Sequence, residues 1–115
     1  GVIVFRKEHF EMTNGYPINC IGWGSEDNIL GERVRKIGLN VYRYPFGRFY
    51  SVPHIPRIQN PIEYDAHLKN GKIREDEKNG KTNFEHNGLS NINLNMFEII
   101  TEQKENYKHI KIKLN

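Results

Sequence analysis

Apolar residues fall in short groups along this chain, and their spacing differs from one group to the next. The unbroken apolar run Val2–Phe5 predicts a short buried strand. Lys7–Thr13 fits two helical turns, because Asn and Gly at 14–15 and a proline at 17 form a helix stop. Two glycines and a proline in the stretch 17–24 predict an irregular loop.

The next segment carries the clearest helical periodicity. Leu30, Val34 and Ile37 recur at helical spacing and mark one buried stripe. Ser25 precedes them as an N-cap, and two carboxylates occupy the first turn, where they meet the positive end of the helix dipole. Gly38 stands where a glycine commonly ends a helix. The pattern predicts a helix between Ser25 and Gly38.

The middle of the chain has weaker signals. Leu39–Tyr44 and Arg48–Val52 are predicted as strands around a Pro45–Gly47 turn. His54–Phe84 contains prolines, asparagines, glycines and a dense mixture of charges, which indicates a long functional or mobile loop.

The end of the chain predicts a β-hairpin. Apolar residues alternate over 92–96, and they alternate again with lysines over 110–114. Glu102–Asn106 is the expected connection between the two strands.

Composition narrows the class of protein. Apolar residues make up 37% of the 115 residues and the mean hydropathy is −0.74, values typical of one small, polar globular domain. No stretch of about 20 apolar residues is present, so the sequence predicts no membrane span. The single cysteine, Cys20, excludes an internal disulfide. The net charge is +3, but lysines alternate with acids along the chain, which does not favour a nucleic-acid partner.

The chain opens at Gly1 directly with a strand-like run and has no targeting signal of its own. We therefore expect it to continue upstream in a longer protein, and that upstream sequence can contain a membrane anchor. As a separate piece it is expected to expose an apolar edge and to self-associate.

One apparent motif fails. Residues 79–82, Asn-Gly-Lys-Thr, end like a phosphate-binding loop, but Glu75 stands where that motif needs a glycine. The five histidines also lack the spacing of a two-histidine zinc helix.

The run Gly22-Trp23-Gly24-Ser25-Glu26-Asp27 is the strongest candidate for chemistry. Two glycines let the backbone turn sharply around the indole, a flat apolar surface that suits the carbon face of a sugar. The two carboxylates that follow at a helix N-terminus suit proton abstraction and hydroxyl binding. A core tryptophan followed by ordinary first-turn acids is the alternative interpretation of these residues.

These residues resemble the β-1,4-galactosyltransferase family. The similarity is greatest at Gly22–Asp27 and covers nearly the whole chain. It is poor over about 55–85 and returns at Asn87-Gly88-Leu89 and the final hairpin. N-acetylgalactosaminyl- and chondroitin-type transferases share the central motif. The terminal hairpin favours the galactosyl branch.

The resemblance implies an α/β fold, the C-terminal, acceptor-side portion of a GT-A-type glycosyltransferase, with a mixed sheet, flanking helices and a terminal hairpin. Residues 1–115 form this one domain. The nucleotide-binding half and its Asp-x-Asp metal motif are absent from the chain. The compartment stays open: the Golgi lumen for a eukaryotic member, the cytoplasm for a bacterial or viral one.

The resemblance also implies roles for individual residues in transfer of galactose, or a related sugar, from a UDP-sugar to a carbohydrate hydroxyl with inversion. Asp27 corresponds to the general base, and Glu26 binds acceptor hydroxyls. Trp23 lies between the two sugars on the loop that Gly22 and Gly24 shape.

Another set of implied roles concerns the metal and the acceptor. His54 corresponds to a histidine ligand of Mn²⁺, which offsets charge on the departing nucleotide. Three positions depart from the family pattern. Ser51 replaces a metal-binding methionine of the family, and Asn28 replaces an acid. In the family an Arg-Phe pair recognises N-acetyl groups, and the residues of this chain nearest to that position are Glu63 and Tyr64. Tyr64 is therefore a candidate acceptor contact. A catalytically silent carbohydrate-binding module derived from such an enzyme is the rival prediction from another class.

Overall fold

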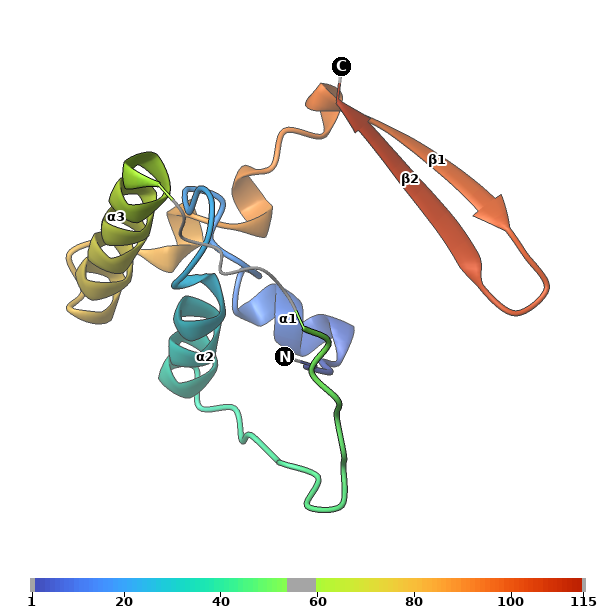
Figure 1. Cartoon of the computed structure of the whole chain (residues 1–115), viewed down its shortest axis with the longest axis horizontal. Coiled ribbons are helices and arrows are strands. Elements are labelled where there is room, and N and C mark those ends of the chain that lie inside the picture. Colours follow the sequence, from blue (N-terminus) through green and yellow to red (C-terminus); the bar gives the residue numbers. More distant parts are fainter. Residues whose placement is uncertain (1, 54–59, 115) are drawn as a thin grey trace.

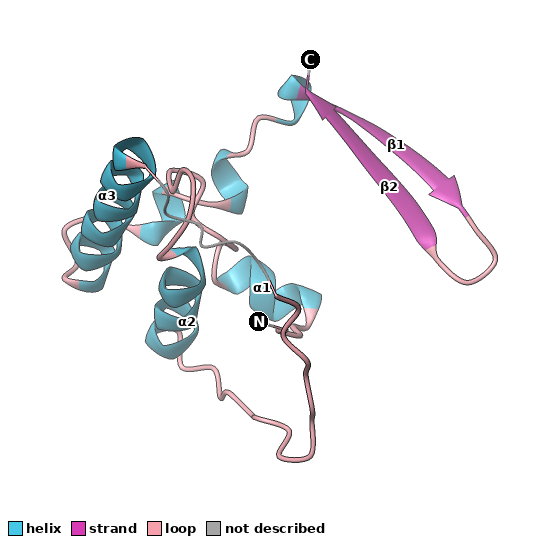
Figure 2. Cartoon of the chain, viewed as in Figure 1, coloured by secondary structure: helices cyan, strands magenta, loops and turns pink. Residues whose placement is uncertain are grey.

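The computed structural model describes residues 2–53 and 60–114 and is shown in Figure 1. Its α-helices are α1 (Lys7–Met12), α2 (Glu26–Lys36) and α3 (Pro61–Lys78). Short 3-10 turns at Phe84–His86, Leu89–Asn91 and Leu94–Met96 lead into the antiparallel strands β1 (Phe97–Gln103) and β2 (Lys108–Leu114). Figure 2 shows α1, α2 and α3 gathered in one body, with the hairpin standing apart from them.

Both predicted early helices are confirmed. After α1 the backbone turns left-handed at Asn14 and Gly15, with φ of 55° and 65°, as the helix-stop pattern predicts. Gly38 has φ of 78° just beyond α2 and ends that helix as expected. Ser25 precedes α2, but its φ is 72° and its hydroxyl makes no capping hydrogen bond, so the predicted side-chain cap is wrong.

The apolar core is very small. Ile29, Leu30 and Val34 of α2 are its buried hydrophobic members in the described chain, and Ile37 of the predicted stripe is only half-buried. Polar groups therefore hold much of the helical body together.

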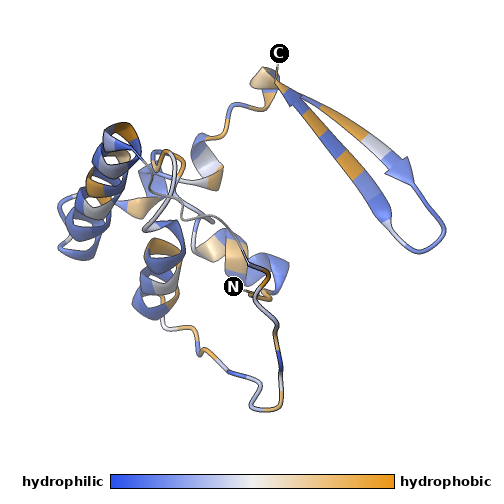
Figure 3. Cartoon of the chain, viewed as in Figure 1, coloured by the Kyte–Doolittle hydropathy of each residue, from blue (hydrophilic) through white to orange (hydrophobic). Residues whose placement is uncertain are grey.

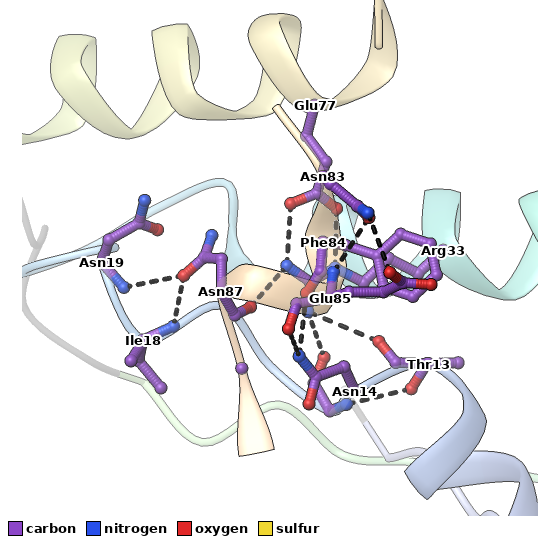
Figure 4. Close-up of polar contacts among 12 residues, drawn as sticks. Thr13, Asn14, Ile18, Asn19, Arg33, Glu77, Asn83, Phe84, Glu85 and Asn87 are labelled. Atoms are coloured by element: carbon purple, nitrogen blue, oxygen red, sulfur yellow. Dashed lines mark hydrogen bonds and ion pairs between the residues drawn. The ribbon is translucent and has the colours of Figure 1, made fainter. Parts of the chain in front are cut away.

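Arg33 is the centre of that polar interior. Its side chain is 1% exposed, and its guanidinium pairs with Glu77 of α3. It also donates to the carbonyl of Gly15 at 2.9 Å. A further bond, to the Asn87 carbonyl at 2.8 Å, is drawn in Figure 4. One side chain of α2 thus joins the end of α1, the end of α3 and the segment after α3.

Asparagine amides continue this network. The buried Asn14 donates to the Phe84 carbonyl at 2.8 Å and accepts from the Ser90 amide at 2.8 Å. Asn87 Oδ1 accepts from the backbone amides of Ile18 and Asn19, which Figure 4 also shows. Segments about 70 residues apart in sequence are fixed side by side through these bonds.

The sheet differs from the expectation. Val2–Phe5, Leu39–Tyr44 and Arg48–Val52 were predicted as strands, but all three segments are irregular and their large apolar side chains are mostly exposed. A strand needs a paired neighbour in a ladder, and the strand pair of the described chain is formed by β1 and β2 alone. The Pro45–Gly47 turn does form, closed by the Gly47 amide on the Tyr44 carbonyl at 3.4 Å.

The predicted long loop is also wrong over most of its length, because residues 61–78 form α3. Asn60 accepts a hydrogen bond from the Glu63 amide at 3.0 Å, and Pro61 occupies the first helical position. Both are standard helix-start features.

The terminal hairpin is confirmed, but its first strand lies further along the chain than expected. Residues 92–96 form turns, and β1 begins at Phe97, where Phe97 pairs with Leu114 and Ile99 with Ile112. Together these findings give a mixture of helices with a two-stranded antiparallel sheet, in place of a larger mixed sheet. Within the described ranges no helix has the length and apolar character needed to cross a membrane.

Candidate functional site

The loop before α2 has an unusual backbone. Gly22, Gly24 and Ser25 all have left-handed φ values, of 74°, 107° and 72°. Glycine adopts this conformation without steric strain, so the positive φ values at Gly22 and Gly24 cost little conformational free energy. The result is a tight loop that carries Trp23 with its side chain 42% exposed.

A side chain of α3 forms hydrogen bonds with the backbone of this loop, as a neighbouring strand would. The buried Asn70 accepts from the Ile21 amide at 3.1 Å and donates to the Ile21 carbonyl at 3.0 Å. The same amide group contacts the Trp23 carbonyl at 3.5 Å. The backbone on each side of Gly22 is thereby hydrogen-bonded in a region that lacks regular structure.

His67, one helical turn before Asn70, supports the indole itself. The two rings stack with centroids 5.3 Å apart and planes inclined by 20°. A β-carbon on Gly24 would come within 2.5 Å of His67 Nδ1, so the absent side chain makes room for the imidazole. One face of Trp23 is therefore taken by His67, while the ring keeps a substantial exposed area.

Glu26 and Asp27 begin α2 directly after the loop, as predicted, but their environments differ. Asp27 is exposed at the first turn. Glu26 is half-buried, and its Oε2 is buried without a hydrogen-bond partner in the described part of the chain. Adjacent carboxylates in unlike surroundings suit different chemical tasks.

Glu26 is close enough to Cys20 to affect the acidity of that thiol. Burial is the largest cause that raises the pKa of Cys20, and the Glu26 charge is the next. Both causes disfavour the thiolate. The half-buried Cys20 is thus a packed thiol at the base of the loop.

The other two predicted residues lie away from this cluster or outside the description. Tyr64 is in the first turn of α3 and is 55% exposed, and none of the contacts described above for the Trp23 loop involves it. His54, the expected Mn²⁺ ligand, lies outside the described residues. No group of three or more His, Cys, Asp or Glu side chains elsewhere in the described chain is arranged to hold a metal ion. The described residues therefore do not form a metal site by themselves.

Sequence reasoning missed the supporting residues on α3. Ala66 and His67 stand four and three positions before Asn70 on α3, so all three reach the same loop, with the Ala66 methyl next to Gly22. The start signal Asn60-Pro61 with Glu63 could have revealed α3. Nothing local in the sequence pairs it with residues 21–24.

Comparisons with known proteins agree with the motif. The family model described as the N-terminal domain of galactosyltransferase matches residues 1–55, which include the loop and both acids. Human β-1,4-galactosyltransferase 5 is 34% identical over 119 residues, covering 99% of this chain and 27% of that protein. Mouse β-1,4-galactosyltransferase 6 is 41% identical over 56 residues, covering 47% of this chain and 15% of that protein. Drosophila melanogaster β-1,4-galactosyltransferase 7 is 42% identical over 43 residues, 37% of this chain and 13% of that protein.

These similarities place the chain among the glycosyltransferase sequences. It belongs to the β-1,4-galactosyltransferase family, and the resemblance seen at Gly22–Asp27 is confirmed. The chain spans about a quarter or less of the length of these relatives. The family description names an N-terminal domain, whereas the motif suggested a C-terminal portion. The position of this segment in a longer protein stays a prediction.

Proposed function

We propose that this chain forms the acceptor side of a glycosyltransferase that moves galactose, or a related sugar, from a UDP-sugar to a carbohydrate hydroxyl with inversion. The observation that carries the proposal is a partly exposed, rigidly supported indole with an exposed carboxylate four residues further along the chain. Trp23 is the sugar-stacking surface, and Asp27 is the general base. The GT-A fold of the complete enzyme is part of the same proposal.

The support for Trp23 comes from its preorganisation. Stacking of His67 and the Asn70 hydrogen bonds hold the ring and its backbone before any ligand arrives. An indole that is already fixed loses little conformational entropy when a sugar packs on it. A core tryptophan would be closed off from solvent, and Trp23 is 42% exposed.

The support for Asp27 comes from its position and charge. It is exposed in the first turn of an 11-residue helix, where the dipole stabilises a carboxylate. An ionised carboxylate can accept the proton of an acceptor hydroxyl as that oxygen attacks the anomeric carbon. The nucleotide diphosphate leaves from the opposite side of that carbon, which inverts its configuration.

Glu26 is proposed to bind the acceptor. Its partnerless Oε2 is a buried acceptor of hydrogen bonds, and such an oxygen costs free energy while it stays unpaired. A turn of the side chain toward an acceptor hydroxyl therefore costs little. Tyr64, exposed on α3, is a second proposed acceptor contact.

Mn²⁺ and the UDP-sugar belong to the proposal through His54 and through residues outside this chain. One imidazole is too small a donor set for a Mn²⁺ site, so carboxylates and diphosphate oxygens are needed as well. An Asp-x-Asp strand in the complete protein is the expected source of those carboxylates.

Asp27→Asn in the intact protein tests the central assignment. The substitution keeps the size of the side chain and removes its proton-accepting charge, so turnover is expected to fall by roughly 10²–10⁴. Glu26→Gln is the matched variant at the adjacent acid and should raise KM for the acceptor more than it lowers kcat. A folded Asp27→Asn enzyme with near-normal kcat would falsify the assignment of the base.

A silent carbohydrate-binding module is the second candidate. It rests on the exposed indole of Trp23, which can stack on a sugar without any donor site. It predicts that the intact protein binds a carbohydrate through Trp23 but transfers no sugar from any UDP-sugar. N-acetylgalactosaminyl- and chondroitin-type transfer are the enzymatic alternatives, and a comparison of donors in the same assay separates them.

A further inference from the structure

A cavity of about 510 Å³ lies between the C-terminal halves of α2 and α3. Five basic and two acidic side chains line it, and they leave an excess of three positive charges. The net charge of the whole chain is also +3 with neutral histidines. The formal charges outside this cavity therefore balance, and the positive excess of the chain is concentrated in one place.

Both acids of the cavity are already paired with arginines that also line it. Glu77 binds the guanidinium of Arg33, and Glu32 accepts from Arg74 Nε at 2.9 Å and from Arg74 Nη2 at 2.7 Å. The cations that remain have no ion pair within the described part of the chain: Arg35, Lys36 and Lys78. All three are exposed to solvent.

Part of this positive charge is held in place before any ligand binds. Lys36 Nζ lies over the Phe84 ring, 5.4 Å from its centroid, and an ammonium in such a contact keeps donors for a second partner. Arg74 is fixed by its two bonds to Glu32, and a guanidinium has five N–H donors, of which these bonds use two. Donors that are already positioned lose little conformational entropy on binding.

Compensation of the helix dipoles accounts for only part of the excess. Arg35 and Lys36 lie in the last turn of α2, and Lys78 lies in the last turn of α3. Each helix C-terminus carries roughly half a negative charge, so the two ends together offset about one of the three positive charges. A surplus of about two positive charges is left for a ligand.

We propose that this cavity binds a compact phosphorylated ligand, either a small molecule with a phosphate monoester or inorganic phosphate itself. A phosphate monoester carries about −1.5 to −2 at neutral pH, which matches the surplus. The volume is typical of small-molecule pockets, roughly 300–1,000 Å³. A long polyanion needs a wider basic surface, and elsewhere in this chain lysines alternate with acids. The guanidinium of Arg35 suits two phosphate oxygens at once.

The cavity lies at the opposite end of α2 from Asp27. Lys36 ends the helix nine residues after Asp27, a distance of about 14 Å along the helix axis. A phosphate bound between the helix ends therefore does not touch the proposed base. The inference does not rest on the proposed transfer reaction, because phosphate binding is measured without turnover.

The first experiment measures binding of inorganic phosphate and of glucose 6-phosphate to the intact protein by calorimetry at constant ionic strength. Saturable binding of at least one of them is expected, and the tighter of the two identifies the source of the phosphate group. Lys36→Gln and Lys78→Gln should each weaken binding about tenfold, since each removes one charge-assisted hydrogen bond. Unphosphorylated glucose should not bind in this cavity.

Lys7→Gln is the matched control, because it removes the same charge from an 82% exposed lysine of α1. It should leave phosphate binding unchanged. An equal loss in Lys7→Gln would mean that phosphate responds only to the net charge of the protein, and this result would overturn the proposal. Absence of saturable binding to the folded wild-type protein would overturn it as well.

A second measurement separates this site from the proposed function. Asp27→Asn should keep the affinity for phosphate, and Lys36→Gln should keep both KM values of the transfer reaction. If Lys36→Gln raised KM for the UDP-sugar as strongly as it weakened phosphate binding, the cavity would belong to donor binding and the separate site would be overturned. If Asp27→Asn leaves turnover intact, the proposed base fails while phosphate binding stands or falls by calorimetry alone.

Discussion

Arg33 and Glu77 form a doubly hydrogen-bonded ion pair that joins α2 to α3 inside the molecule. Arg33 Nε lies 2.6 Å from Glu77 Oε1, and Arg33 Nη2 lies 2.7 Å from Oε2. The two side chains are only 1% and 8% exposed. Since α3 carries His67 and Asn70, this pair also sets the position of the support beneath Trp23.

The first prediction concerns that pair. Glu77→Gln leaves a buried guanidinium without its counter-charge, so the free energy of unfolding should fall by about 3–5 kcal/mol. Lys69→Gln removes one partner of the exposed Asp65–Lys69 pair and should change stability by less than about 1 kcal/mol. Chemical denaturation measures both. Equal, small losses would show that the buried pair does not hold α2 and α3 together.

The second prediction concerns the Trp23–His67 stack. Gly24→Ala places a β-carbon against His67 and also strains a backbone with φ of 107°, whereas Gly38→Ala meets open space at φ of 78°. Both variants should lose about 1 kcal/mol or more from backbone strain, and Gly24→Ala should lose clearly more than Gly38→Ala.

Fluorescence provides a direct readout, because Trp23 is the single tryptophan of this chain. Gly24→Ala should change its emission and Gly38→Ala should not. Adding His67→Ala to Gly24→Ala should relieve the extra loss of stability. No relief in the double variant would contradict the stacked arrangement.

The third prediction concerns Cys20 and its dependence on pH. Burial and Glu26 raise the pKa of the thiol above 9.0, so alkylation at pH 8 should be slower than that of a free cysteine peptide. Glu26→Gln should shift the rate profile to lower pH, and Glu85→Gln should not.

Because the pKa of Cys20 is higher in the folded state, the free energy of unfolding also depends on pH. The contribution of Cys20 to stability is fully present below pH 9.0 and is lost as the pH rises through the higher folded value. A thiol that reacts at the free-peptide rate would contradict the burial of Cys20, and a rate profile unchanged by Glu26→Gln would place Glu26 away from it.

The fourth prediction concerns the metal. His54→Ala in the intact protein should strongly weaken activation by Mn²⁺ while leaving the melting temperature unchanged. His86→Ala, at an exposed histidine of the first 3-10 turn, is the control. This chain by itself should bind Mn²⁺ only weakly, since one imidazole lacks its carboxylate partners. Unchanged Mn²⁺ dependence in the variant would remove His54 from the site.

The fifth prediction concerns the hairpin. One of its faces carries four exposed apolar residues, Ile99, Ile110, Ile112 and Leu114. Figure 3 shows apolar bands along the strands. The isolated chain should therefore self-associate in size-exclusion chromatography. Ile112→Lys should reduce the association and Lys113→Gln, on the opposite face, should not. A stable monomer at high concentration would be evidence against an exposed association surface.

Local signals in the sequence predicted the elements that depend on local chemistry. The stops after α1 and α2 follow from residues that adopt positive φ at 14, 15 and 38, and alternation over 110–114 predicted the last strand. The cluster of Trp23, Glu26 and Asp27 was also predictable, because loop and helix start are adjacent in sequence. The strands expected at 39–52 did not form, since periodicity gives no information about whether a pairing partner exists.

The tertiary structure alone decided what supports the site. Asn70 and His67 lie more than 40 positions from the loop that they hold. These contacts depend on how α1, α2 and α3 pack around Arg33, a buried charge whose partners are backbone carbonyls and a distant glutamate. Local propensity governs where a helix begins and ends, but only the packing of helices determines which side chains meet.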